Sequence, residues 1–411
     1  MRPFFVLLHR WFGLAAAVFL FIAGLTGAVI AFDHELDAAL NPQFFEARGR
    51  SPAQDALMLA DRLEAAEPQL RVRYLPLNAE PGHTLLAMVE PRDPARPLGF
   101  NQLALDPATG EVQARREWGA LSLSRENLLP FLYALHYSLH LPEAGGIAWG
   151  IWLMGLIGLG WVLDCFVALY LSFPTWRGWR KSLAFRWRKG GHALTFDLHR
   201  SGGVWLWLLL LVIALTSVAM NLRQQVVVPL VNALSPITPS AFDTRRPGTV
   251  PVNPALTRAQ ALAAAERVAR ARGITGPAGG IFHDALYGVY GVGFFKPGND
   301  HGDGGLGNPW VYVDARDGSP AGASIPGEGT AGDLYLQLQF PLHSGRILGL
   351  PGRILVAALG VAVAVLSVTG VLIWLRKARA RRHAARTSRA SSPTSPSSPS
   401  TPAPAREPLP R

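Results

Sequence analysis

The stretch LHRWFGLAAAVFLFIAGLTGAVIAF, Leu8 to Phe32, decides the fold. From Trp11 to Phe32 it carries no charge, and it is long enough to cross a hydrocarbon core of ~30 Å as one helix. Three other stretches are similarly long and apolar: Ile147–Phe173, in which Asp164 is the one charged residue, Gly203–Leu222 and Ile354–Leu375. The sequence therefore predicts an α-helical integral membrane protein with four transmembrane helices. The first run is too long for a signal peptide, so we expect an uncleaved anchor.

The charges predict the orientation of these helices. The 411 residues include 39 Lys and Arg against 28 Asp and Glu. Residues 1–10, 174–202 and 376–411 together hold 18 of the basic residues and only two acidic ones. Since basic loops stay on the cytoplasmic side, we expect both termini in the cytoplasm. The basic surplus thus reports orientation, and the apolar composition argues against a nucleic-acid partner.

Two large segments, 33–146 and 223–353, are then expected on the outer side. Each opens with a helical pattern, Pro52–Ala66 or Leu256–Arg272, and continues with alternating strands around Gly-containing turns. This pattern predicts two small α+β domains. The Ser/Pro-rich end, Thr387–Arg411, is expected to be disordered. The predicted organisation is helix 1–32, outer domain 33–146, helix 147–173, basic loop 174–202, helix 203–222, outer domain 223–353, helix 354–375 and tail 376–411.

Short histidine motifs indicate an internal duplication. Leu8-His9-Arg10 precedes the first span and Leu198-His199-Arg200 precedes the third, while Leu139-His140 and Leu342-His343 precede the second and fourth. Two copies of the same orientation imply a pseudo-twofold axis along the membrane normal. Such an axis would make His9 face His199 at the cytoplasmic end, and His140 face His343 at the outer end.

Two imidazoles that face each other in a helix bundle are suited to axial ligation of a haem iron. A zinc site is less natural, because it needs four close ligands and the only cysteine is Cys165. Any one of these histidines could instead be an ordinary polar residue at the level of the lipid headgroups. Their symmetric placement favours redox ligation.

Three further residues belong to the candidate set. His136 lies four residues before His140, and His34 follows the first span; either could replace an outer ligand or bind a haem propionate. Asp164 is an acid inside a span, which is costly and suggests function. It could accept a hydrogen bond from a ligand histidine, although a proton path or a structural bond is equally open. His283 and His301 are expected to be solvated, and the cluster of Asp300, His301 and Asp303, which lies among glycines, resembles a flexible loop more than a metal site.

The motifs resemble a known family. Leu8-His-Arg-Trp-Phe-Gly-Leu, the run from Trp161 to Leu171, Asp197-Leu-His-Arg-Ser-Gly-Gly and Pro341-Leu-His-Ser-Gly-Arg are similar to the PepSY-associated transmembrane proteins, which include FoxB-type siderophore reductases. The resemblance implies a bacterial inner-membrane protein with two haem b groups and periplasmic PepSY-like domains. It also implies electron transfer outward to a ferric siderophore. His9, His199, His140 and His343 would then be the prime ligands, with His136 and His34 behind them.

Three functions remain open at this point. The first is the dihaem ferric-chelate reductase, which would take electrons from a separate cytoplasmic reductase or from quinol, since no dinucleotide-binding fingerprint follows a strand. The second is a non-enzymatic PepSY membrane protein that binds or inhibits a periplasmic peptidase or signalling partner. The third, a chelate transporter, is disfavoured because the spans carry few charges or breaks.

Overall fold

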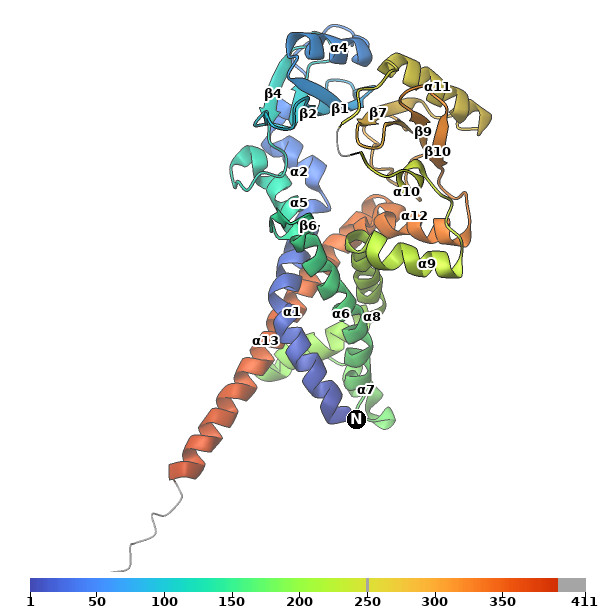
Figure 1. The fold of residues 1–411 in the computed structure, drawn as a ribbon. Helices are drawn as coiled ribbons and strands as arrows, with labels where there is room; N and C mark the ends of the chain where they lie inside the picture. Colours follow the sequence, from blue (N-terminus) through green and yellow to red (C-terminus); the bar gives the residue numbers. More distant parts are fainter. Residues whose placement is uncertain (249–250, 391–411) are drawn as a thin grey trace, which may run out of the picture.

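The computed structural model describes residues 1–248 and 251–390, and the described chain contains four helices long and apolar enough to cross a membrane, as the sequence predicts. They are α1 (Arg2–Ile30), α6 (Trp149–Ser172), α8 (Gly191–Asn221) and α13 (Leu350–Ala390). Figure 1 shows them gathered in one bundle with a sheet at one end. We name this the sheet end, and we name the opposite end, with the N-terminus and α7 (Trp179–Leu183), the terminal end.

Glycines bring the spanning helices into close contact. A Cβ atom on Gly24 of α1 would lie 2.5 Å from the carbonyl oxygen of Gly360 on α13, and a Cβ on Gly155 of α6 would overlap the Leu222 side chain just after α8. Helices that lack these side chains can approach backbone to backbone, which increases their van der Waals contact. Gly24 and Gly155 therefore serve helix packing at these positions.

The sheet is a single structure built by both outer segments. Its strand order is β10-β9-β8-β7-β1-β2-β3-β4, and neighbouring strands are antiparallel. The strands are β1 (Leu70–Pro76), β2 (Leu85–Pro91), β3 (Gln102–Leu105), β4 (Val112–Arg116), β7 (Ala278–Asp284), β8 (Val289–Phe294), β9 (Trp310–Asp314) and β10 (Pro320–Ser324). Strands β1 and β7 join the two segments, with Tyr74 opposite Phe282.

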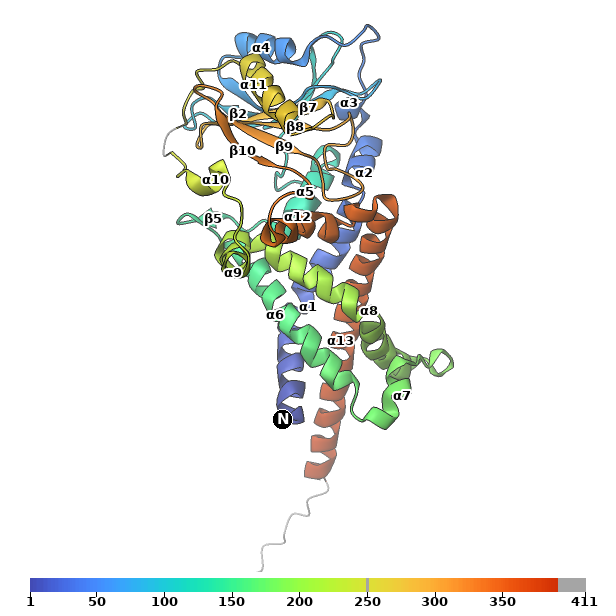
Figure 2. The same ribbon diagram turned by 90° about the vertical axis from the view of Figure 1, so that its right-hand side faces the viewer.

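This central pairing corrects the expectation of two separate domains. Each four-stranded unit alone would expose the backbone of β1 or β7 along an open edge, and pairing the two strands satisfies those groups. Helices α4 (Ala56–Ala66) and α11 (Arg258–Ala271) lie side by side on one face of the sheet (Figure 2). Both helical patterns in the sequence are thus confirmed, and each helix begins at a capping side chain, Asp55 or Thr257.

Small residues let these two helices lie close to the strands. Ala60 of α4 and Ala265 of α11 are fully buried, as are Leu75 and Val292 of the sheet. Arg258 of α11 forms ion pairs with Asp61 and Glu64 of α4, so a charged bridge also joins the two segments.

Short helices connect the sheet to the bundle. Helix α5 (Leu128–Ser138) packs on α1, and α12 (Ala331–Ser344) packs on α8; both lie between the sheet and the spans (Figure 1). The remaining helices and turns are α2 (Asp33–Leu40), α3 (Pro42–Phe45), α9 (Val228–Leu234), α10 (Ala241–Thr244), the hairpin β5 (Glu143–Ala144) and β6 (Ile147–Ala148), 3-10 turns at Arg125–Asn127, Trp176–Gly178, Trp187–Lys189 and Arg346–Leu348, and a π turn at Arg223–Val227.

The C-terminal end of α13 differs from the sequence expectation. The helix continues to Ala390, so Thr387–Ala390 at the start of the Ser/Pro-rich tail are helical rather than disordered. The rest of that tail, residues 391–411, lies outside the described residues.

Candidate functional site

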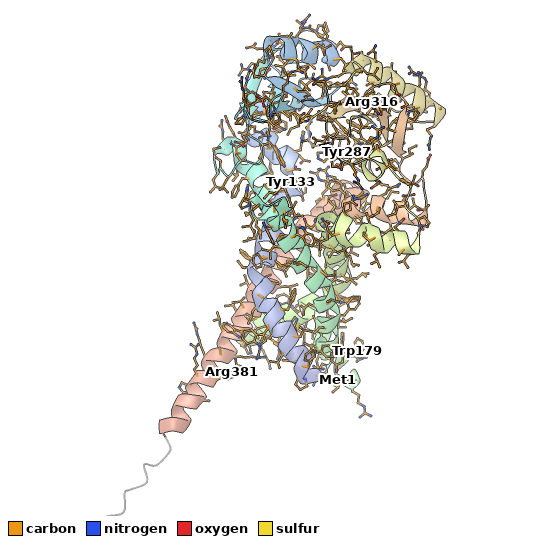
Figure 3. All side chains as sticks on the ribbon, in the orientation of Figure 1. Met1, Tyr133, Trp179, Tyr287, Arg316 and Arg381 are labelled. Atoms are coloured by element: carbon orange, nitrogen blue, oxygen red, sulfur yellow. The ribbon has the colours of Figure 1, made fainter. Side chains whose placement is uncertain are left out.

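A cavity of about 330 Å³ opens inside the bundle near the sheet end. Its wall includes Gly24 and Gly27 of α1, Trp161 of α6, His136 of α5 and His343 of α12. Tyr133 of α5 also lines it, and Figure 3 shows this residue where the bundle meets the sheet. The cavity is apolar apart from a few polar groups, which is the usual character of a cofactor or ligand site.

His136 and His343 meet across this cavity. Their ring centroids are 6.1 Å apart and their planes are tilted by 60°. His136 Nδ1 lies 3.0 Å from the Ala23 carbonyl oxygen, which can only accept, so Nδ1 is the donor. His343 Nδ1 lies 3.0 Å from Thr216 Oγ1, and that hydroxyl already donates to the Val212 carbonyl. The Nε2 atom of each neutral ring therefore keeps its lone pair.

His9 and His199 form a second pair toward the terminal end. Their ring centroids are 6.0 Å apart, with a tilt of 49°. His199 Nδ1 donates to the Leu366 carbonyl oxygen at 2.9 Å. His9 Nδ1 lies 2.9 Å from both carboxylate oxygens of Asp164, so Asp164 holds this ring as the sequence suggested it could. Nδ1 is again engaged on both rings, which leaves Nε2 available for a ligand.

The structure brings His136, rather than His140, opposite His343. Helix α5 ends at Ser138, and Leu139 and His140 follow with φ of 55° and 53°. These left-handed conformations turn the chain, so His136 and His140 do not share a helix face. His140 instead stacks on the Phe131 ring at 4.5 Å and bonds the Phe131 carbonyl oxygen through Nε2 at 2.9 Å. The expected facing of His140 and His343 is wrong.

His34 lies at neither pair. It is an exposed residue of α2, and its ring meets the edge of Phe45 at 5.1 Å. The candidate set therefore divides in the structure: His9, His199, His136 and His343 form two pairs, Asp164 supports one of them, and His34 and His140 lie apart.

The pairs fit a metal held between two axial imidazoles. With metal–nitrogen bonds of ~2 Å, two such rings have their centres roughly 6 Å apart. Ligating histidines also donate the other ring N–H to a carboxylate, carbonyl or similar acceptor, as these four rings do. Within the described chain no group of three or more His, Cys, Asp or Glu side chains is arranged to bind a metal.

Two further observations fit a flat anionic cofactor. A Cβ on Gly27 would lie 2.9 Å from His136 Cε1, and a Cβ on Gly370 would lie 3.0 Å from His199 Cε1, so glycine makes room for one ring of each pair. Arg10 and Arg200, the neighbours of His9 and His199, each have a buried Nε without a hydrogen-bond partner in the described protein. Orphaned donors of this kind suit carboxylates such as haem propionates.

An ionic cluster lies at the sheet end of the cavity, whose wall includes Asp33 and Arg346. Arg346 pairs with Asp303 and Asp33, while Arg353 pairs with Glu35 at 2.6 Å and with Asp303 at 3.6 Å. The glycine-flanked segment that includes Asp303 is therefore tied to the bundle rather than free in solvent.

His301 of the same segment lines the cavity. Burial alone would lower the pKa of His301, but the hydrogen bond to Asp300, 2.8 Å long, and the Asp300 charge outweigh it and raise the pKa. His301 and Asp300 therefore form a hydrogen-bonded pair at this end of the cavity, whose wall also includes the ion-paired Arg346.

Two threonines at the histidine pairs were not predicted from the sequence. Thr26 and Thr216 follow His9 and His199 by the same number of residues, and each lies about 3 Å from a histidine of the other pair. The repeat could have revealed them, since Leu-Thr occurs at Leu25-Thr26 and Leu215-Thr216. The same comparison would have aligned Leu135-His136 with Leu342-His343.

Comparison with known proteins adds one finding. The family model described as PepSY-associated TM region matches residues 6–377, which is nearly the whole chain. No curated protein matches the chain.

Proposed function

The chain belongs to the family of PepSY-associated transmembrane proteins, and from this we propose that it is a dihaem reductase that delivers electrons to a ferric siderophore. The observation that carries the proposal is the pair of facing histidines near each end of one bundle. His9 and His199 would hold one haem b, and His136 and His343 the other. Haem would supply reversible one-electron transfer at each pair.

The spacing of the pairs supports transfer across the membrane. His9 contacts Asp164 toward the terminal end, whereas Thr26, farther along the same helix, contacts His136. These two positions on α1 are roughly 25 Å apart by helical rise, close to the thickness of a hydrocarbon core. Trp161 and the apolar cavity wall would insulate the path from water.

The proposed orientation rests on the basic loops. Residues 1–10, 174–202 and the start of the tail would face the cytoplasm of a bacterial inner membrane, and the sheet would lie in the periplasm. Electrons would then enter near His9 and His199 from a cytoplasmic reductase or quinol. Ferric siderophore would accept them near the sheet end, one electron per iron. The Fe(II) product binds hard oxygen donors more weakly, so the iron is released.

An internal duplication is part of the proposal. Both halves have a spanning helix, a four-stranded unit with one covering helix, a histidine helix and a second span, in this order. The strands of each half also run outward from the β1–β7 junction in chain order. Under this reading His9, Thr26 and His136 correspond to His199, Thr216 and His343. A twofold axis between the halves would place each corresponding pair face to face.

A spectroscopic experiment tests the function. The full chain, purified in detergent after expression with sufficient haem, should show dithionite-reducible haem b bands. Mixing the reduced protein with a ferric hydroxamate chelate and an Fe(II)-specific chromophore should reoxidise the haem and yield one trapped Fe(II) per electron lost. A fully folded but colourless protein would overturn the proposal and favour the non-enzymatic PepSY binding protein. Bound haem without Fe(II) release would exclude a ferric siderophore as the substrate, but the protein would still be an electron carrier.

A further inference from the structure

The four histidines differ in the group that accepts from Nδ1. His136 donates to the Ala23 carbonyl, His199 to the Leu366 carbonyl and His343 to the Thr216 hydroxyl. These acceptors are neutral. His9 alone of the four donates to a carboxylate, that of Asp164, whose side chain is only 13% exposed. One pair thus carries a formal negative charge next to a ring, and the other does not.

The position of Asp164 makes this difference large. Both carboxylate oxygens lie at 2.9 Å from His9 Nδ1, so the charge points directly at the ring N–H. In the apolar interior of a bundle the charge is weakly screened, and its effect on a nearby redox centre exceeds that of a surface carboxylate. The side chain nearest to Nδ1 of His199 is that of Thr369, whose Oγ1 lies 3.3 Å away. A threonine hydroxyl is neutral, so it exerts no such effect.

We propose that Asp164 is a positioning residue that makes the reduction potential at the His9–His199 site lower than that at the His136–His343 site. This inference rests on the proposed function, since it needs haem at both sites. A carboxylate that accepts the Nδ1 proton makes the imidazole a stronger electron donor through Nε2, which stabilises Fe(III) over Fe(II). The neutral acceptors at the other pair have no such effect.

The consequence is a built-in direction for the electrons. An electron at the lower-potential site moves downhill to the higher-potential one, from the terminal end toward the sheet end. Residues of the chain, and not only the supply of substrate, would then favour delivery toward the sheet.

Potentiometric titration of the haem-loaded full chain tests this order. His136→Ala leaves the His9–His199 site alone, and His9→Ala leaves the other, so the two variants assign each potential to its pair. The site retained in His136→Ala must titrate at the more negative potential. The reverse order, or equal potentials, would overturn the inference even if every variant of Asp164 failed to fold.

Substitution at Asp164 then isolates the charge. Asp164→Asn keeps the size and an acceptor oxygen but removes the charge, so the potential of the His9–His199 site should shift to a more positive value. Asp164→Glu, which restores a carboxylate, should return it toward the wild-type value. Thr216→Val is the matched control, because it changes an acceptor at the other pair and should leave the His9–His199 potential in place.

The outcomes separate the inference from the proposed function. If the wild-type chain binds no haem, the proposed function itself fails. If it binds two haems and Asp164→Asn leaves both potentials unchanged, the function stands and the inference is wrong. The low-spin ferric EPR signal gives a second readout, since stronger donation from His9 should change the signal of that site and leave the other unaffected.

Discussion

His136 and His343 lie with their ring centroids 6.1 Å apart, and each ring is held through Nδ1 by an acceptor on a different spanning helix, α1 or α8. Neither histidine is itself on a spanning helix; α5 and α12 bring them there from the sheet side. The sheet and the bundle therefore build this pair together. A change in how the sheet sits on the bundle would alter the distance between the rings.

This geometry predicts that His136, and not His140, holds the outer haem. His136→Ala should reduce bound haem to about half of the wild-type content, because one of two axial ligands is lost at that site. Haem per chain, measured as the pyridine haemochrome, checks the prediction. His140→Ala is the matched control four residues away and should retain the full content, since His140 is hydrogen-bonded to the Phe131 carbonyl and stacked on the Phe131 ring, away from His343. Loss of haem in His140→Ala alone would reverse the assignment.

The contact between α1 and α13 predicts a different kind of effect. Gly24→Ala would bring Cβ within 2.5 Å of the Gly360 carbonyl oxygen, a backbone atom that cannot rotate away. The helices must separate locally, and we expect a loss of about 1–3 kcal/mol in stability. Thermal unfolding in detergent measures it.

Gly13→Ala supplies the control for that substitution. Among the described residues, no atom outside the adjoining backbone of α1 lies within 4 Å of its Cβ position, so the usual helix-favouring effect of alanine should leave stability unchanged or slightly raised. Equal destabilisation by both substitutions would show that glycine flexibility, rather than close packing, matters in this helix.

Most of the framework followed from simple patterns in the sequence. Hydropathy located the four spans, and helical periodicity located α4 and α11. These patterns are local, so tertiary structure did not override them. The pairing of β1 with β7 is a contact between distant segments, and nothing in the alternation of either strand distinguishes a shared sheet from two separate ones.

The histidine site was predictable only where local sequence patterns determine it. The pairing of His9 with His199 and the support from Asp164 followed from repeat spacing and the cost of a buried acid. The choice between His136 and His140 depended on where α5 ends. The helix ends because Leu139 and His140 adopt left-handed conformations. Such conformations are usually marked in a sequence by glycine, and neither residue is one.

A buried ion pair links the start of the outer segment to the sheet. Arg116 of β4 donates to Asp37 of α2 at 2.6 and 3.1 Å, and the two side chains are 2% and 7% exposed. Asp37→Ala should cost about 3–5 kcal/mol, because it leaves an unpaired buried guanidinium. The same substitution in an Arg116→Met background should cost much less. Chemical unfolding of the two single variants and the double variant gives the free energies of unfolding for this double-mutant cycle.

The exposed pair between Arg96 and Asp93 is the control for this cycle. Its side chains are 87% and 56% exposed, so Asp93→Ala should change stability by no more than about 1 kcal/mol. Equal losses at Asp37 and Asp93 would mean that burial does not determine the strength of these pairs.

His283 predicts how the sheet responds to acid. This side chain, expected from sequence to be solvated, is 4% exposed, and neither ring nitrogen has a hydrogen-bond partner in the described protein. Burial, with help from the Arg71 charge, lowers the pKa of His283 to about 4. The unfolded chain binds the proton from about pH 6.5 downward. Between these values the unfolded state holds more protons, so stability falls as the pH falls, by up to ~1.4 kcal/mol per unit.

Hydrogen exchange of the β7 and β8 amides measures this loss where it occurs, because exchange there reports the opening of the sheet. Protection should decline from pH 6.5 toward pH 4, after correction for the intrinsic exchange rate. His283→Phe keeps an aromatic ring beside Tyr290, whose ring centroid is 4.8 Å away, but cannot be protonated. It should therefore flatten the decline, whereas His192→Gln, at an exposed position near the terminal end, should preserve it. An equal decline in His283→Phe would assign the acid sensitivity to the carboxylates that pair across α4 and α11.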